Sequence, residues 1–207
     1  MILRRTVEPA VEPISLAEAK DHLRLEHALD DDYVVALVKA ARQYTEQATN
    51  HAIITQTWEA TFNGFPYEDN ITIPFGPLIR VASITYRDVA NTIQTLSPTT
   101  LYEVDLGSHS KRGRVILRDR TVWPPTYGRW NDLIVTFVAG FGDAPTDVPE
   151  PLRQAMKLLV SQMYENRTPE ITGTIVTKVS FAYDSLIAPY KMPNKRFMRE
   201  NMFGRWS

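Results

Sequence analysis

The sequence predicts an α+β fold, in which N- and C-terminal helices form a helical bundle body with an inserted antiparallel β-domain and an extended C-terminal arm. Residues 15–50 and 147–167 carry apolar side chains at helical spacing, whereas residues 51–146 are rich in β-branched and aromatic residues separated by Gly and Pro. The apolar stripe of each helical stretch cannot be buried alone, so we expect the two stretches to pack together. Residues 1–14 then form an N-terminal arm and residues 168–207 a C-terminal extension.

The helical body is expected to open with a capping box. The Ser15 hydroxyl can accept the backbone N–H of Glu18, whose carboxylate reaches back to the N–H of Ser15. A second helix is expected to begin at Asp30-Asp31-Asp32, where carboxylates favour the positive end of the helix dipole, and to end near Asn50. Its apolar face recurs at helical spacing and contains Val34, Leu37, Val38, Ala41, Tyr44, Thr45 and Ala48.

The β-domain is expected to contain about six to eight short strands, arranged as a sandwich or a small barrel. One hairpin is expected over residues 102–119, with Gly107 to Gly113 at its tip. The other expected strands lie within residues 53–65, 70–75, 78–88 and 132–141.

Helical periodicity returns after the β-domain. Thr146 and Asp147 are the candidate N-caps, and the prolines of this stretch fall only in the first turn. One face is apolar and carries Leu152, Ala155, Met156, Leu159, Val160 and Met163. The pattern weakens from Thr168 onward, where an extended arm or a hairpin is expected.

Composition excludes several classes of function. The 207 residues carry a formal net charge of −1, so any charge-driven binding must come from local patches. The chain has no cysteine, which removes disulfides, thiolate zinc sites and cysteine nucleophiles. The N-terminus shows no secretion signal, and no apolar run is long enough to cross a membrane. We therefore expect a protein made in the cytoplasm and without a membrane partner.

No motif predicts catalysis, a metal or a cofactor. The Asp30-Asp31-Asp32 run has no second acidic cluster at a metal-site spacing, and a helix N-terminus explains it. Gly140-Phe-Gly142 would need a third glycine where Pro145 stands, so it is not a dinucleotide loop. We therefore predict a non-enzymatic protein with no catalytic, cofactor-binding or metal-binding residues.

Two basic segments remain as candidate binding surfaces. The first runs from Lys111 to Arg120, and is either a solvated hairpin face or an edge presented to phosphate or to an acidic protein. Its arginines are Arg112, Arg114, Arg118 and Arg120. The second is the C-terminal tail, where five basic residues and one acid follow from Lys191, giving a local charge of +4. A disordered end is one reading of the tail, but its aromatic and arginine content is typical of interfaces. Its candidate binding residues are Tyr190, Lys195, Arg196, Phe197, Met198, Arg199, Met202, Phe203, Arg205 and Trp206.

The order of these segments resembles a known family. The start "PISLAEAKDHLRL", the helix "DDDYVVALVKAARQYTEQATN", the exit "VTFVAGFGDAPTDVPEPLRQAMKLLVSQMYENR" and the closing "LIAPYKMP" are similar to those of head–tail connector (adaptor) proteins. That family occurs in long-tailed double-stranded DNA phages and in phage-derived gene transfer agents. The resemblance spans about residues 13–190 and is weaker in the β-domain.

The resemblance implies a structural role in the neck of a virion or phage-like particle, after synthesis in a bacterial host. Proteins of this family form a ring, typically dodecameric, under the portal protein. The ring extends a channel through which double-stranded DNA passes without sequence-specific binding, and it docks the downstream neck protein, a stopper or a tail terminator. The tail residues given above would then bind the portal, and Arg112, Arg114, Arg118 and Arg120 would make inter-ring or neck contacts.

Two alternatives remain open at the level of sequence. A nucleic-acid-binding module that is not part of a virion would stack bases on aromatic residues of the β-domain and hold phosphates with the 111–120 arginines. Its candidate stacking residues are Trp58, Tyr86, Trp123, Tyr127 and Trp130. A hydrolase would need two carboxylates that converge in a cleft.

Overall fold

The computed structural model describes residues 1–98, 100–166 and 181–192, which fall into two compact units. The helical unit contains residues 9–55 and the described residues of 140–191. The β-unit contains residues 1–8, the described residues of 56–139, and Met192. This mixture of helices and antiparallel sheets confirms the predicted α+β class.

The first two helices form as the sequence predicts. Helix α1 spans Leu16–Leu23, and both hydrogen bonds of the Ser15–Glu18 capping box are present. Helix α2 spans Asp31–Thr49 and ends where Asn50 adopts the left-handed conformation at φ 57°. That conformation costs asparagine less than most residues, and it stops the helix at the predicted position.

The second half of the helical unit differs from the sequence prediction at both ends. Helix α3 spans Glu150–Glu165 and has Pro149 at its N-cap, so the expected caps Thr146 and Asp147 are wrong. Those two residues lie in a separate 3₁₀ turn, η1 (Pro145–Asp147), where the Asp147 carboxylate accepts the N–H of Ala144 at 2.9 Å. The Asp147 carboxylate therefore pairs with a backbone N–H of its own turn and does not cap α3. The N-cap of α3 is instead a proline, which has no N–H that needs a partner.

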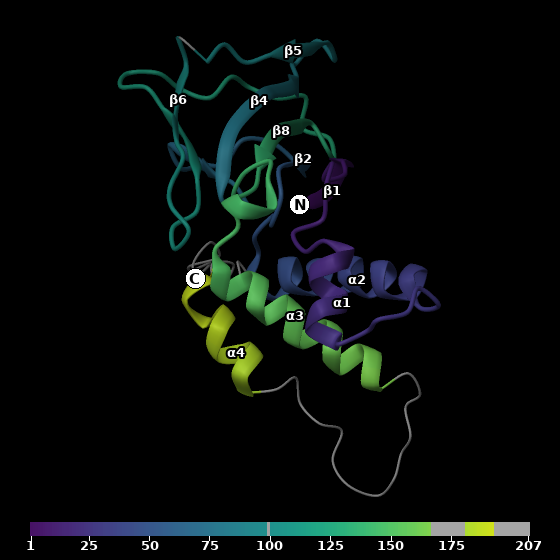
Figure 1. Ribbon diagram of the computed structural model, residues 1–207. Helices are drawn as coiled ribbons and strands as arrows, with labels where there is room; N and C mark the ends of the chain where they lie inside the picture. Colours follow the sequence, from purple (N-terminus) through teal and green to yellow (C-terminus); the bar gives the residue numbers. More distant parts are fainter. Residues whose placement is uncertain (99, 167–180, 193–207) are drawn as a thin grey trace, which may run out of the picture. The chain divides into compact units, whose positions relative to one another are not determined.

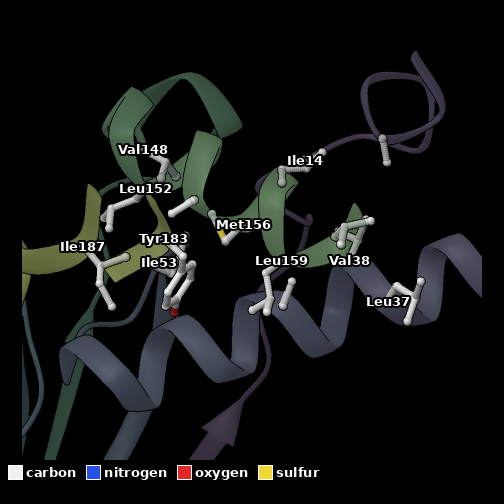
Figure 2. Close-up of a cluster of buried hydrophobic side chains, with 14 of the residues drawn as sticks. Ile14, Leu37, Val38, Ile53, Val148, Leu152, Met156, Leu159, Tyr183 and Ile187 are labelled. Carbon is white, nitrogen blue, oxygen red and sulfur yellow. The ribbon is translucent and has the colours of Figure 1, made fainter. Parts of the chain in front are cut away.

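A fourth helix replaces part of the expected extended arm or hairpin. Helix α4 spans Phe181–Ile187 and continues into the 3₁₀ turn η2 (Ala188–Tyr190). Tyr183 and Ile187 are buried in the same apolar cluster as α2 and α3 (Figure 2). Residues 181–190 are thus part of the helical unit, because one face of this short helix completes its core.

One apolar cluster holds the helical unit together (Figure 2). Leu37 and Val38 of α2 face Met156 and Leu159 of α3, and the Tyr183 hydroxyl lies 3.2 Å from that of Thr45. The expected packing of the N-terminal helices against the helix that follows the β-domain is therefore present. Other buried members of the cluster are Ile14, Ala19, Val34, Ala41, Ile53, Ile54, Val148, Leu152, Ala155, Val160 and Ile187.

The β-unit contains two antiparallel sheets (Figure 1). The larger sheet has the order β1-β2-β8-β4-β5, and its central strand β8 is flanked by β2 and β4. Its strands are β1 (Ile2–Val7), β2 (Gln56–Phe62), β8 (Leu133–Ala139), β4 (Leu78–Arg87) and β5 (Ile93–Thr95). The smaller sheet has the order β3-β7-β6, with strands β3 (Asn70–Thr72), β7 (Arg114–Leu117) and β6 (Tyr102–Asp105).

The strands include one that sequence reasoning did not predict. Residues 2–7, expected to be an N-terminal arm, form β1 and pair antiparallel with β2 at the edge of the larger sheet. The hairpin expected over residues 102–119 is confirmed as β6 and β7, which pair from Tyr102–Leu117 to Asp105–Arg114. Among the described helices, none combines the length and the apolar composition needed to cross a membrane.

Candidate interaction surfaces

Two basic side chains of the β6–β7 hairpin are paired with a carboxylate of the same hairpin. Asp105 Oδ2 accepts hydrogen bonds from Lys111 Nζ and Arg114 Nη2, each at 3.1 Å, while its Oδ1 accepts the Gly107 N–H at 2.9 Å. The backbone N–H of Gly107, helped by the two cations, lowers the pKa of Asp105 to about 2. This arrangement fixes the turn at the tip of the hairpin.

The four arginines proposed as inter-ring contacts do not form one exposed face. Arg114 is held by Asp105, Arg118 Nη1 lies 3.3 Å from Glu103 Oε1, and half-buried Arg112 donates to the carbonyl oxygen of Pro74. Burial lowers the pKa of Arg112. Arg120 alone of the four is exposed without an ion pair in the described part of the chain.

The aromatic residues proposed as a base-stacking platform are mostly covered by other side chains. Trp58 packs on Phe75, with a centroid separation of 4.6 Å, and the Arg5 guanidinium lies 5.5 Å from its ring. Phe65 stacks on Trp123 at 4.9 Å, and the ring of Tyr86 meets Phe65 edge-on at 5.4 Å. Of the five candidates, Tyr127 and Trp130 alone are exposed. The geometry therefore gives little support to the nucleic-acid-binding alternative.

The segment between β7 and β8, residues 118–132, is a long irregular loop that is anchored from within. The Trp123 indole N–H donates to the Glu68 carbonyl at 2.9 Å, and the Tyr127 N–H donates to the Arg87 carbonyl at 3.0 Å. The Arg129 N–H donates to the buried Asp132 carboxylate at 2.5 Å. Loops of this length in compact domains are uncommon and are usually either functional or disordered, and these hydrogen bonds hold this one at three points.

Of the candidate portal-binding residues near the C-terminus, Tyr190 lies within the described residues and the others do not. Tyr190, in η2, is half-buried and packs edge-on against Phe141 with centroids 6.3 Å apart, so its ring contributes to the helical unit. Met192 is buried in the β-unit, where its Cε approaches Gly76. The other candidates lie outside the described residues, namely Lys195, Arg196, Phe197, Met198, Arg199, Met202, Phe203, Arg205 and Trp206.

The acidic start of α2 is occupied by contacts within the chain. Asp30 accepts a hydrogen bond from the Tyr164 hydroxyl at 2.6 Å, and Asp31 forms a 2.7 Å ion pair with Lys20. In residues 1–98, 100–166 and 181–192, no cluster of three or more His, Asp or Glu side chains could hold a metal ion.

A buried ionic network that sequence reasoning missed stabilises the helical unit. The Arg42 side chain is 1% exposed and lies 2.7 Å from Glu12 and 3.1 Å from Glu46. The second oxygen of Glu46 accepts the Ile53 N–H at 3.2 Å. The network thus ties the segment before α1 and the segment after α2 to one helix. The i, i+4 spacing of Arg42 and Glu46 was visible in the sequence, but their burial was not.

A protein-family model and several solved structures match this chain. The family model described as "Phage gp6-like head-tail connector protein" matches residues 13–101, which cover α1, α2 and strands β2 to β5. The predicted resemblance to head–tail connectors is confirmed. No curated protein matches the chain significantly.

Solved structures from gene transfer agent (GTA) particles share the fold over nearly the whole chain. A chain from the neck of an empty GTA particle, computed with C6 symmetry, is 24% identical with a TM-score of 0.75. A chain from the virion of a native GTA particle gives the same values, and one from the neck of a native particle, computed with C12 symmetry, gives a TM-score of 0.73 at 24% identity. Each match covers 94% of this chain and 97% of the other. The three matches are to structural parts of particles.

Proposed function

We propose that this protein is a structural head–tail adaptor that forms a ring beneath the portal of a virion-like particle. The ring extends the DNA channel and docks the next neck protein, a stopper or a tail terminator. The observation that carries this proposal is the agreement between the connector family match over residues 13–101 and the shared fold with GTA neck chains over 94% of this chain. Double-stranded DNA would pass through the lumen without sequence-specific binding.

The internal contacts of the helical unit suit a component that must withstand force. Its core joins segments from both ends of the chain, and the Arg42 network fastens the segments on either side of α1 and α2 to that core. Removing one partner from such a buried network typically costs several kcal/mol, because the other charge is left buried without its counter-ion. We expect a ring subunit that retains packaged DNA to keep these contacts in each of its copies.

The chemistry of the exposed side chains supports a choice of partners for the ring. We propose that the C-terminal segment, with Tyr190 as its anchored beginning, binds the portal protein through its arginine and aromatic side chains. Arginine can form bidentate pairs with portal carboxylates, and repetition around a ring adds avidity. We also propose that Arg112, Arg114, Arg118 and Arg120 lie near an inter-ring or neck contact, where exposed Arg118 would make the direct contact. The complete ring would contain twelve copies, the symmetry of one matching neck structure.

Co-purification with a portal ring tests this proposal. Affinity-tagged portal from the same particle should retain the full chain, and should lose it when residues 193–207 are removed. The truncation ends after buried Met192, so that the β-unit keeps its packing. A full-length chain that fails to bind portal rings and DNA-filled heads would refute the adaptor role. Binding that persists in the truncated chain would instead refute the portal role of the tail.

A further inference from the structure

The 118–132 loop carries both positive charge and exposed apolar side chains. Trp130 is 85% and Val122 79% exposed. Arg120 and Arg129 are also exposed, and within the described residues neither guanidinium forms an ion pair, although that of Arg129 lies 5.1 Å from the Tyr127 ring. We call Arg120, Val122, Arg129 and Trp130 the basic patch. Tryptophan and arginine are the residue types that most often dominate interface energies.

Hydrogen bonds within the chain already fix the backbone that carries the basic patch before any partner binds. The buried Asp132 carboxylate holds the Arg129 backbone, and the Trp123 indole fixes the middle of the loop. A partner would therefore not have to order the backbone, which costs about 1–2 kcal/mol for each residue that is fixed on binding.

The helical unit carries a patch of the opposite charge at the α1–α2 corner. Leu29 is 91% and Val35 48% exposed. Glu26 and Asp32 beside them are exposed, and neither forms an ion pair within the described residues. We call Glu26, Leu29, Asp32 and Val35 the acidic patch. Each patch thus combines two charged side chains that form no ion pair within the described residues with two exposed apolar side chains, and the charges of the two patches are opposite.

We infer that the basic patch of one copy docks on the acidic patch of the next copy around the ring. The inference rests on the proposed ring and identifies which surfaces close it. Two different, complementary patches on one chain form a head-to-tail contact, and repetition of that contact produces a closed ring when the rotation between copies allows closure. The carboxylates of the acidic patch can pair with the arginines of the basic patch. The apolar side chains of the acidic patch, Leu29 and Val35, can pack against Trp130 and Val122 of the basic patch. Nucleic acid would satisfy the basic patch but leave the acidic patch without a partner.

Cysteine crosslinking tests the contact on a clean background, because the chain has no cysteine of its own. The double variant L29C/W130C, treated with a flexible bis-maleimide in purified particles, should give a ladder of multimers on denaturing gels. Each single-cysteine variant should give little product and nothing beyond a dimer. The control L29C/V89C keeps the acidic-patch cysteine and moves the other to Val89, a 64% exposed residue of the β-unit. A ladder no stronger than that of the control would overturn the inference.

Charge reversal provides a second, independent readout. E26K/D32K and R120E/R129E should each reduce the amount of chain incorporated per particle several-fold, whereas the four substitutions together should restore it. Reversal of exposed Asp143 is the matched control and should have no effect. Failure of the combined variant to recover would overturn the pairing, and loss of DNA binding as the only effect of R120E/R129E would assign the basic patch to nucleic acid.

These outcomes separate the inference from the proposed function. If the wild-type chain is present in particle necks but L29C/W130C gives no ladder, the patch pairing fails and the adaptor role stands. If the wild-type chain is absent from particles, the adaptor role fails. The same crosslinking, carried out on the concentrated purified protein, then decides whether the patches meet.

Discussion

Replacing Arg42 by methionine should strongly destabilise the helical unit. Methionine fills much of the same space, so the principal loss is the charge. Glu46, whose side chain is 4% exposed, would keep the hydrogen bond from the Ile53 N–H and lose the Arg42 cation. Removing one partner of a buried ion pair typically costs about 3–5 kcal/mol. Since a whole domain is stable by about 5–15 kcal/mol, this loss is a large fraction of the total.

Urea unfolding followed by far-UV circular dichroism measures this cost, because that signal is dominated by the helices. The control Glu12→Gln should cost only about 1 kcal/mol, since the Glu12 side chain is 30% exposed and Arg42 would keep Glu46. The double variant R42M/E46Q should recover much of the loss, because it removes the buried charge of residue 46 and keeps an amide oxygen that can accept the Ile53 N–H. An R42M variant that unfolds within about 1 kcal/mol of wild type would refute the structural role of the network.

Three further predictions concern the core, the hairpin and the tail. Leu159→Asp should abolish soluble protein, because it places a charge in a side-chain position that is 4% exposed, whereas Leu29→Asp at a 91% exposed position should not; normal thermal stability of the first variant would contradict the shared core. Asp105 has its folded pKa lowered from 3.8 to about 2, so its contribution to stability is complete above about pH 4 and is lost as the pH falls through 2. The difference in unfolding free energy between wild type and Asp105→Asn should therefore shrink as the pH falls from about 4 to 2. A difference that grows on acidification would contradict a lowered pKa of Asp105. Removal of residues 193–207 should leave the far-UV spectrum and melting temperature nearly unchanged while incorporation into DNA-filled heads is lost; incorporation at the wild-type level would exclude the tail as the anchor.

Local signals predicted the elements that depend on local interactions. The Ser15–Glu18 capping box, the end of α2 at Asn50 and the β6–β7 hairpin all formed as expected, since each depends on residues close in sequence. The joint packing of α2 and α3 was also predictable, because each helix carries an apolar stripe that needs a partner.

The elements that were missed depend on distant partners. Residues 2–7, "ILRRTV", are too short and too charged to be recognised as a strand, and they become one by pairing with β2 fifty or more positions away. Helix α4 has only seven residues, and its buried Tyr183 and Ile187 need the surfaces of other helices. Of the proposed contact arginines, the sequence could not show that Arg112 would be half-buried or that Arg114 would be held by Asp105.

Cryo-electron microscopy of purified particles, with the identity of the chain confirmed by side-chain density, tests the central claim most directly. The account predicts a ring of this chain between the portal and the next neck protein, with the twelvefold symmetry used to compute one neck structure that shares its fold. Intact, DNA-filled particles whose neck contains no ring built from this chain would contradict it.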